Sequence, residues 1–329
     1  MSADEVCVVK KSGLFTTIQD AGRKGWQKKG IPPAGVMDEY AFQTANILTG
    51  NDGAEAVLEV TMLGPVLLFT KPSVVAVTGA DLQPSLNNKP VDNWRSFRVR
   101  DGDELSFAGM KKGARAYIAV QGGFDGDEML GSRSTYVKAG LGGMNGRALE
   151  KGDRLSTARS VSMLKRCSRL SVSLIPEYGG ETVLRVLEGP ESSAFTEESL
   201  HAFYQSDFTV SNDSDRMGCR MEEAPLVHRE SADILSDAVD TGTIQAAADG
   251  KPMILMADRQ TTGGYTRPAS VIQVDLSKAA QLLPGETVRF EKVTLEHAHD
   301  LLKEQRRRLA ALALASNNMQ SCGFMETLE

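Results

Sequence analysis

The segment ADRQTTGGYTRPA (257–269) gathers an acid, two arginines, a glutamine, three threonines and a glycine pair in thirteen residues. Gln260 can donate to and accept from an amide, which makes it a candidate catalytic residue, and Thr261 and Thr262 offer hydroxyl groups. The Gly263–Gly264 pair would let the backbone approach a ligand without an intervening Cβ. The segment therefore predicts a wall that binds a small polar molecule. A turn that threonine and glycine merely shape is the alternative.

Charged and aromatic side chains flank this wall. Asp258, a further catalytic candidate, forms with Arg259 either a charge pair or a clamp on a ligand. Tyr265 is placed to cover the site. Arg216 is a candidate for substrate binding, and a structural salt bridge with Asp215 is the alternative.

Two further polar clusters lie in the N-terminal half. The first, in LFTTIQDAGRKGW (14–26), holds Gln19, Asp20 and Arg23. We expect these three residues either to be functional or to lie at a domain interface, and a surface ion pair is the alternative. We expect Asp20 to act in catalysis and the other two to bind substrate.

The second cluster is LGSRSTY (130–136). Successive turn amides beside an arginine are typical of an anion-binding nest. The residues of this predicted nest are Ser132, Arg133, Ser134 and Thr135. We expect Arg133 to act in catalysis and the remaining three to bind substrate.

No established catalytic motif accompanies these clusters. The chain has no G-x-x-x-x-G-K-[ST] phosphate loop and no G-x-S-x-G nucleophile elbow. GLGGMNG (140–146) fails the spacing of a dinucleotide fingerprint, because Asn145 stands where the third glycine belongs. None of the four histidines lies in H-E-x-x-H, so no metal is expected, and a biotin-carrying Ala-Met-Lys-Met motif is absent. Any chemistry must rest on backbone amides, arginines, carboxylates and amide side chains.

Short apolar runs, punctuated by glycine or proline, must position these clusters, and they predict a mainly β fold with a few helices. The runs of strand length are 57–69, 73–79, 114–120, 182–190, 253–257 and 270–276. A glycine turn, an acid and an alternating strand recur in DGDELSF (101–107), KGDRLST (151–157) and PGETVRF (284–290). This repetition hints at two related β units.

Three segments predict helices. MDEYAFQTANILTG (37–50) has Asp38 as its N-cap and Gly50 as its stop. TEESLHAFYQSD (196–207) begins with a threonine and two acids, which suits the helix dipole. The segment 294–315 carries a continuous apolar stripe, and we expect a loose tail after it.

Length and composition bound the class of protein. At 329 residues, two domains of roughly 150 residues each are expected. A net charge of −6 does not suggest a nucleic-acid surface. Four cysteines without a C-x-x-C pair are expected to be thiols in a reducing compartment. No apolar signal core and no run of about 18 apolar residues is present, so we expect a cytoplasmic protein without membrane contact.

A seam rich in serine and basic residues, 157–181, predicts the domain boundary near 160–172. The expected division is an N-terminal domain over 1–160, a C-terminal domain over 170–293, and a helix with its tail over 294–329.

Taken in order, five motifs resemble the carboxyltransferase family related to urea amidolyase. They are TTIQDAGR (16–23), MDEYAFQTAN (37–46), LGSRST (130–135), SDRMG (214–218) and DRQTTGGY (258–265). Stand-alone bacterial members of this family include the C subunit of 5-oxoprolinase, also described as a Kip-type antagonist of a kinase inhibitor. The resemblance implies two β-barrel-like domains similar to cyclophilin, with an active site where the domains face each other.

The resemblance leaves three functions open. The first is a component of an ATP-dependent 5-oxoprolinase, which opens 5-oxo-L-proline to glutamate together with two partner chains. One partner is a sister B subunit, and the other is a hydrolase-type A subunit. ATP would then bind in the complex, at a family-specific site shared with the B subunit. The second is carboxyl transfer to urea or a related amide, with biotin on a separate carrier. The third is a non-catalytic Kip-type antagonist that binds a kinase inhibitor.

Four segments depart from patterns common in the family. One is Arg220–Glu223, where an Arg-Leu-x-Gly sequence is common after the DRMG motif. Ala34 in GIPPAG stands where serine is frequent, and Ala246–Ala248 in QAAADG replace valine and proline. Asp127 and Glu128 occupy the place of a Val-Pro pair before LGSRST. The scaffold motifs are intact while the loop chemistry differs, which leaves the substrate open.

Overall fold

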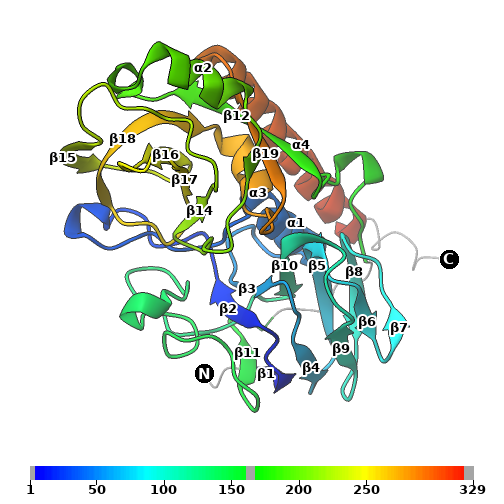
Figure 1. Ribbon diagram of the computed structural model, residues 1–329. Coiled ribbons are helices and arrows are strands. Elements are labelled where there is room, and N and C mark those ends of the chain that lie inside the picture. The colour runs from blue at the N-terminus through cyan, green and yellow to red at the C-terminus, as the bar shows by residue number, and fades with distance from the viewer. Residues whose placement is uncertain (1–3, 161–166, 322–329) are drawn as a thin grey trace. The chain divides into compact units, whose positions relative to one another are not determined.

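The computed structural model describes residues 4–160 and 167–321, which divide into two compact units (Figure 1). Unit 1 comprises the described residues within 1–23, 38–177 and 306–329, and unit 2 comprises 24–37 and 178–305. Part of the predicted boundary, 161–166, lies outside the described residues.

Unit 1 contains two antiparallel sheets. Its elements are β1 (Asp4–Lys11), β2 (Phe15–Gln19), α1 (Glu39–Thr49), β3 (Val57–Thr61), β4 (Val66–Phe69), β5 (Ser73–Asp81), β6 (Pro84–Leu86), β7 (Lys89–Pro90), β8 (Arg95–Val99), β9 (Glu104–Phe107), β10 (Lys112–Val120), the 3-10 turn η2 (Val137–Ala139), β11 (Arg154–Thr157) and η3 (Val172–Leu174). The strand orders are β11-β1-β4-β9-β6-β7 and β2-β3-β10-β5-β8. One apolar core, with side chains such as Val9, Leu67, Val77 and Ile118, draws on both sheets.

Helix α1 covers the second sheet, so its central strands β5 and β10 are buried on both faces. Alternate side chains of β10 serve the two faces: Ile118 enters the core between the sheets, and Tyr117 lies on the helix side. The hydroxyl of Thr78 in β5 donates to the carbonyl of Ala41 in α1 over 2.7 Å. Asp38 caps the helix by accepting the N–H of Ala41 over 2.9 Å, as the sequence predicts.

The buried Tyr117 predicts a pH dependence of stability. Its hydroxyl donates to Glu59 Oε2 over 2.9 Å and accepts the Asp38 N–H over 2.7 Å. Burial, and then the charges of Glu59 and Asp38, raise the pKa of this phenol well above its ordinary value of 10.0. The folded chain therefore retains a proton that the unfolded chain releases near that pH. The stability that protonated Tyr117 contributes to the folded chain is fully present below about pH 10 and is lost as the pH rises further.

We expect the free energy of unfolding to fall more steeply above about pH 10 in the wild type than in Tyr117→Phe. Urea unfolding of both proteins, followed by circular dichroism between pH 8 and pH 11, measures the two slopes. Equal slopes would contradict the assignment, because all other titrating groups are shared.

Unit 2 is built on one sheet. Its elements are η1 (Gln27–Lys29), β12 (Glu181–Glu188), η4 (Ser192–Ala194), α2 (Glu197–Gln205), β13 (Phe208–Thr209), β14 (Gly218–Arg220), β15 (Asp233–Ala238), β16 (Thr243–Ala246), β17 (Pro252–Leu255), β18 (Thr262–Val271), η5 (Gln273–Asp275), α3 (Leu276–Ala279) and β19 (Thr287–Lys292). The strand order is β13-β19-β12-β18-β16-β17-β14, and β15 pairs with β18. Strands β12 and β19 pair in parallel and the other pairs are antiparallel.

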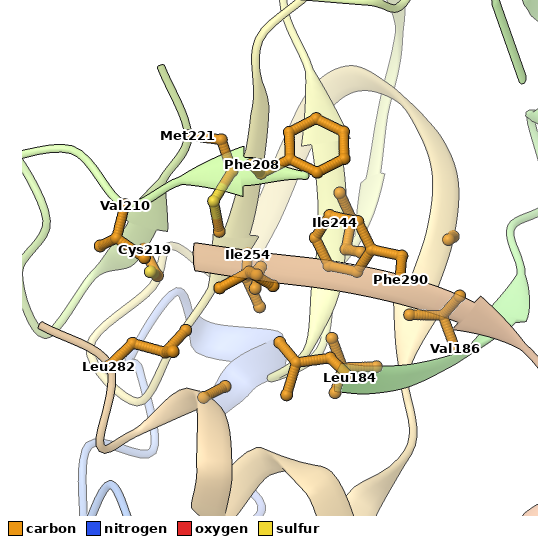
Figure 2. Packing of buried hydrophobic residues seen from close by; sticks show 14 of the residues in the cluster. Leu184, Val186, Phe208, Val210, Cys219, Met221, Ile244, Ile254, Leu282 and Phe290 are labelled. Atoms are coloured by element: carbon orange, nitrogen blue, oxygen red, sulfur yellow. The ribbon is translucent and has the colours of Figure 1, made fainter. Parts of the chain in front are cut away.

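The core of unit 2 packs aliphatic side chains around phenylalanines (Figure 2). Leu184 and Val186 of β12 lie on the same face of the sheet as Phe290 of the neighbouring strand β19. Ile244 of β16 and Ile254 of β17 belong to the same core (Figure 2). Helix α2 adds Phe203, whose ring stacks on Phe290 with centroids 4.7 Å apart. This packing fixes β16 and also β18, which begins at Thr262 within the predicted wall.

Strands account for 37% of the chain and helices for 20%, which confirms the predicted mainly β fold. A bridge between Val210 and Met221 links the ends of edge strands β13 and β14, but no continuous ladder joins them. No closed barrel is found in the described part of either unit.

Two predicted elements end elsewhere. The run 270–276 is a strand only to Val271, because Gln273–Asp275 and Leu276–Ala279 turn into short helices. Helix α4 (Leu295–Ser321) begins where 294–315 predicts but continues six residues further. The loose tail expected after 315 is therefore helical as far as Ser321, and 322–329 lie outside the described residues.

Candidate functional site

In unit 1 the carboxylate of Asp20 gathers the polar residues of the two N-terminal motifs. Asp20 follows β2 and accepts four hydrogen bonds. The hydroxyls of Ser132 and Ser134 donate to Oδ1 over 2.6 Å each, and the N–H of Gly22 donates to Oδ1 over 2.8 Å. The N–H of Arg133 donates to Oδ2 over 2.6 Å. Asp20 therefore organises the loop, and its oxygens are already engaged.

The anion nest predicted in this loop is filled from within. The N–H of Arg133 bonds the Asp20 carboxylate, and the N–H of Ser134 donates to Ser132 Oγ over 3.0 Å. The N–H of Thr135 donates to the backbone of β2 over 2.9 Å. The expectation that these amides attract an outside anion is thus corrected, because the anion in the nest is the chain's own carboxylate.

The guanidinium of Arg133 is the part of this cluster that reaches toward solvent. Its Nε lies 3.3 Å from Asp125 Oδ1, and its Nη2 lies 3.2 Å from Glu128 Oε2. Glu128 is one of the two acids that replace a Val-Pro pair in this loop. The sequence departure therefore gives Arg133 a carboxylate partner that the common pattern would lack.

Gln19 and Arg23 fasten the same loop. Gln19 Nε2 donates to Thr17 Oγ1 and to the carbonyl of Thr135, both over 3.0 Å. Arg23 Nη2 donates to the carbonyl of Ser134. Gln19 and Arg23 are fully buried, so the alternative of a surface ion pair is wrong for them. These two buried side chains fix the loop through its backbone carbonyl groups.

In unit 2, Asp258 pairs with Arg216. Nε and Nη2 of Arg216 lie 2.9 and 3.0 Å from the two carboxylate oxygens, and Nη2 also donates to the carbonyl of Gly35 over 2.6 Å. Both side chains are buried. Asp215 instead accepts backbone N–H groups of its own turn. Neither the Asp258–Arg259 pair nor the Arg216–Asp215 pair considered from sequence is formed.

Arg259 has a different set of neighbours. Its Nη2 donates to Asp240 Oδ1 over 2.7 Å and its Nε to the carbonyl of Val239 over 3.4 Å. Its Nη1 is buried and forms no hydrogen bond with any residue that the structure describes. Burial lowers the pKa of this guanidinium, and the charge of Asp240 opposes that effect.

The remaining residues of the predicted wall divide into exposed and packed groups. Gln260 is half-buried, and its side chain makes no hydrogen bond within the described residues. Thr262 and Tyr265 are exposed, and Thr261 is half-buried. Gln260 therefore stands out as the amide of this wall whose hydrogen-bonding groups remain available to a ligand.

The glycine pair has a packing role. Gly263 lies within β18, and a Cβ there would collide with the side-chain amide of Gln245. A Cβ at Gly264 would meet Ser236 Oγ of β15 at 3.4 Å, which is ordinary contact. Gly263 is thus required by the protein's own interior, whereas only Gly264 fits the expectation of a backbone open to close approach.

Gln245 is a residue that the sequence analysis missed, and a repeated tripeptide signals it. Thr-Ile-Gln occurs at 17–19 in β2 and again at 243–245 in β16. In both units the glutamine is buried and donates to a backbone carbonyl of the unit's own polar motif: Gln19 to Thr135, Gln245 to Tyr265. Both side-chain oxygens lack a hydrogen-bond partner among the described residues. The units thus share one device for fastening a motif loop.

A pocket of about 410 Å³ in unit 2 adjoins the QAAADG loop. Its polar lining consists of His228, Glu230 and Asp249, with Ala248 from the loop itself. The His228 ring is committed to the fold, since Nε2 lies 2.9 Å from Thr266 Oγ1. Within the described residues, no group of three or more His, Cys, Asp or Glu side chains could hold a metal ion.

Each of the two β units thus carries a polar motif of its own, and comparison with known proteins identifies the family. The family model of the carboxyltransferase domain, subdomain A and B, matches residues 29–292. The chain belongs to this family. The resemblance read from the five motifs is thereby confirmed, and the carboxyltransferase domain accounts for most of the chain.

Relatives of this carboxyltransferase-domain protein fall into two groups. The 5-oxoprolinase C subunit of Haemophilus influenzae is 38% identical over 288 residues, which are 88% of this chain and 91% of the relative. The 5-oxoprolinase C subunit of Escherichia coli is 35% identical, with 94% and 98% covered. The urea amidolyase of Saccharomyces cerevisiae is 32% identical, and the match covers 89% of this chain but 17% of that protein.

Solved structures show the same fold. The urea carboxylase of Kluyveromyces lactis matches 95% of this carboxyltransferase domain with a TM-score of 0.87 and 30% identity, and the match covers 29% of that chain. Among the residues that the structure describes, no helix is long and apolar enough to cross a membrane.

Proposed function

We propose that this protein is the C subunit of an ATP-dependent 5-oxoprolinase. It would open 5-oxo-L-proline to glutamate together with a hydrolase-type A subunit, its sister B subunit completing the complex. The reaction consumes one ATP and two water molecules and releases glutamate, ADP and phosphate. The chain would act in the cytoplasm, as one component of an enzyme complex.

The observation that carries this proposal is the match in length. The two relatives named as 5-oxoprolinase C subunits are covered over 91% and 98% of their length. The chain thus aligns with nearly the whole length of each of these two relatives. The urea amidolyases contain a similar domain within a far longer chain, of which the match covers 17%.

The polar residues suit lactam opening in the following way. Cleavage of the ring C–N bond places negative charge on the lactam oxygen, and arginine or amide donors stabilise such charge. We assign this role to Gln260 in unit 2, with Thr261 and Thr262 as hydroxyl donors beside it. The outward guanidinium of Arg133 in unit 1 is a separate candidate for stabilising negative charge. Asp20, Ser132, Ser134 and Thr135 hold the Arg133 loop, and Asp258 and Arg216 hold the segment before Gln260.

The filled nest bears on where ATP binds. Phosphate groups bind to free backbone N–H groups or to arginine. The N–H groups of the 132–135 loop already bond Asp20 and its neighbours, so this loop does not fit a phosphate. We therefore propose that the ATP site is completed in the assembled complex.

A carboxyltransferase acting on urea or a related amide is the second candidate. It is favoured by the fold, which matches the urea carboxylase of K. lactis over 95% of this chain. Its biotin would have to be supplied by a separate carrier protein. The Gln260 amide would then face the carbonyl oxygen of the acceptor amide.

Co-expression of the chain with its two partner subunits tests the first proposal. The assay measures 5-oxo-L-proline-dependent release of glutamate and phosphate. Turnover that requires this chain supports the proposal. A stable complex without turnover rejects it, and transfer from carboxybiotin to urea is then measured. A complex that lacks both activities but binds a kinase inhibitor would identify the Kip-type antagonist.

Gln260→Ala should separate activity from stability. Because the Gln260 side chain makes no hydrogen bond in the described protein, its loss should change the free energy of unfolding by no more than about 0.5 kcal/mol. Loss of one donor to the substrate should lower kcat/KM about tenfold or more. Gln273→Ala, an exposed glutamine in the same unit, serves as the control. Unchanged kcat/KM in Gln260→Ala would remove this residue from the site.

A further inference from the structure

Unit 2 contains three buried arginines, at positions 216, 259 and 267. Arg216 is paired with Asp258 on two atoms. Arg267 bonds both oxygens of Glu191 over 2.6 Å each, Asp237 over 3.1 Å and a backbone carbonyl over 3.1 Å. Two of the three guanidinium groups thus have buried or half-buried carboxylates as fixed partners.

Arg259 lacks such a partner. Its counter-ion is Asp240, whose side chain is 88% exposed, whereas the Arg259 side chain is 1% exposed. One carboxylate oxygen lies 2.7 Å from Nη2, and Nη1 has no hydrogen-bond partner among the described residues. A guanidinium offers five N–H donors in two forks. In Arg259 the fork formed by Nη1 and Nη2 is only half used.

A buried cation in this state is costly for the fold. Desolvation of an incompletely bonded charged group opposes folding, and such groups persist mainly at functional positions. The pKa values of Arg259 and Arg267 shift in opposite directions. Burial lowers the pKa of Arg259, whereas the hydrogen bonds that Arg267 donates to Glu191 raise the pKa of Arg267.

We propose that Arg259 binds the carboxylate of an anionic small-molecule amide. If the proposed function holds, this ligand is 5-oxo-L-proline, and Arg259 receives the carboxylate attached to its lactam ring. The ligand carboxylate spans Nη1 and Nη2 in the end-on geometry that matches a guanidinium fork. Nη1 is shielded from solvent and Asp240 is exposed. The carboxylate therefore arrives from the side of Asp240 and displaces that side chain from Nη2.

This assignment gives the site a criterion for choosing its substrate. A neutral amide such as urea offers the half-used fork of Arg259 only an uncharged carbonyl oxygen, whereas an amide with a carboxylate offers two charged acceptor oxygens. Gln260, the next residue along the chain, has its amide available for the lactam group. Recognition of charge and recognition of the amide are thereby assigned to neighbouring residues.

Ligand affinity measured by calorimetry tests this assignment. The probes are 5-oxo-L-proline and its uncharged carboxamide, and the protein is the full chain, alone and in complex with its partner subunits. The wild type should prefer the carboxylate. Arg259→Met should abolish the preference by weakening carboxylate binding about 10- to 100-fold, with little effect on the carboxamide. Arg259→Lys should restore part of it, because the charge remains and the fork is lost.

Two further variants guard against a purely structural effect. Arg267→Lys alters another buried arginine, whose partners are fixed, and it should keep the preference. Asp240→Asn removes the competing carboxylate and should bind 5-oxo-L-proline more tightly than the wild type. A wild type without preference, a preference that survives in Arg259→Met, or equal losses for both probes would overturn the inference.

The proposed function is judged separately, by turnover in the assembled complex. A carboxylate preference that depends on Arg259 without 5-oxo-L-proline turnover would support the anion site and reject the proposed activity. Turnover of 5-oxo-L-proline, with a carboxylate preference that does not depend on Arg259, would support the proposed activity and reject the anion site.

Discussion

Asp20→Ala should lower the activity of the assembled complex about 100-fold, because the loop that presents Arg133 loses its anchor. The substitution leaves two hydroxyls and two backbone N–H groups without the acceptor that they share. Unsatisfied groups of this kind cost about 1–3 kcal/mol each when buried, and partial access of water reduces that cost. We expect a loss of about 2–4 kcal/mol in the free energy of unfolding. Urea denaturation and steady-state kinetics measure the two effects.

Asp20→Asn gives a graded version of the same test. An asparagine oxygen can still accept from Ser132 and Ser134, whereas its NH₂ group would oppose the N–H of Arg133. Its effects should therefore fall between those of the wild type and Asp20→Ala. Asp101→Asn, in an exposed turn of unit 1, is the control. Full loss of activity in Asp20→Asn with unchanged stability would instead indicate that Asp20 acts directly on the substrate.

Asp258→Asn should lower the free energy of unfolding by about 3–5 kcal/mol, the usual cost of leaving one member of a buried ion pair alone. The side chains of Arg216 and Asp258 are only 9% and 12% exposed, so water does little to solvate the remaining charge. Chemical denaturation of the full chain measures the loss. Asp213→Asn, an exposed aspartate near Arg216, should be neutral.

The double substitution Arg216→Met, Asp258→Leu distinguishes a structural pair from a catalytic one. Replacing both charges by apolar groups removes the buried charge together with its partner, so part of the stability should return. If the variant regains stability and also turnover, Asp258 holds the wall in place without touching the substrate. Recovered stability with turnover still absent would assign Asp258 to the chemistry.

Local sequence patterns predicted most of the elements. The Asp38 cap and the Gly50 stop of α1 appear as expected, because both act on the backbone of their own helix. The three glycine-turn repeats lead into β9, β11 and β19. The prediction of a strand over 270–276 was wrong beyond Val271, because apolar composition alone does not distinguish a strand from a short buried helix.

Partners in the candidate site could not be predicted in the same way. Because Asp258 and Arg259 are adjacent in the sequence, an ion pair between them was expected. In the structure Asp258 pairs with Arg216, and Arg259 pairs with Asp240. The fold brings these pairs together across 42 and 19 positions, which no local pattern encodes. Gln245 was missed for a related reason, since its role depends on packing against Gly263 of the adjoining strand segment. The signal that could have found it is the repeated Thr-Ile-Gln.

The hydrogen bonds of Asp20 also constrain the order in which unit 1 can be completed during synthesis. Its partners follow 112 to 114 positions later in the chain. Once β2 and β3 have left the ribosome they can pair, but about seventy more residues, from Thr61 to Ser132, must be added before Asp20 meets its loop. Strand β1 can pair with β4 earlier, but its second neighbour, β11 at Arg154–Thr157, is made later still. A chain cut between those points would carry both N-terminal strands and yet lack the residues that close the unit around them.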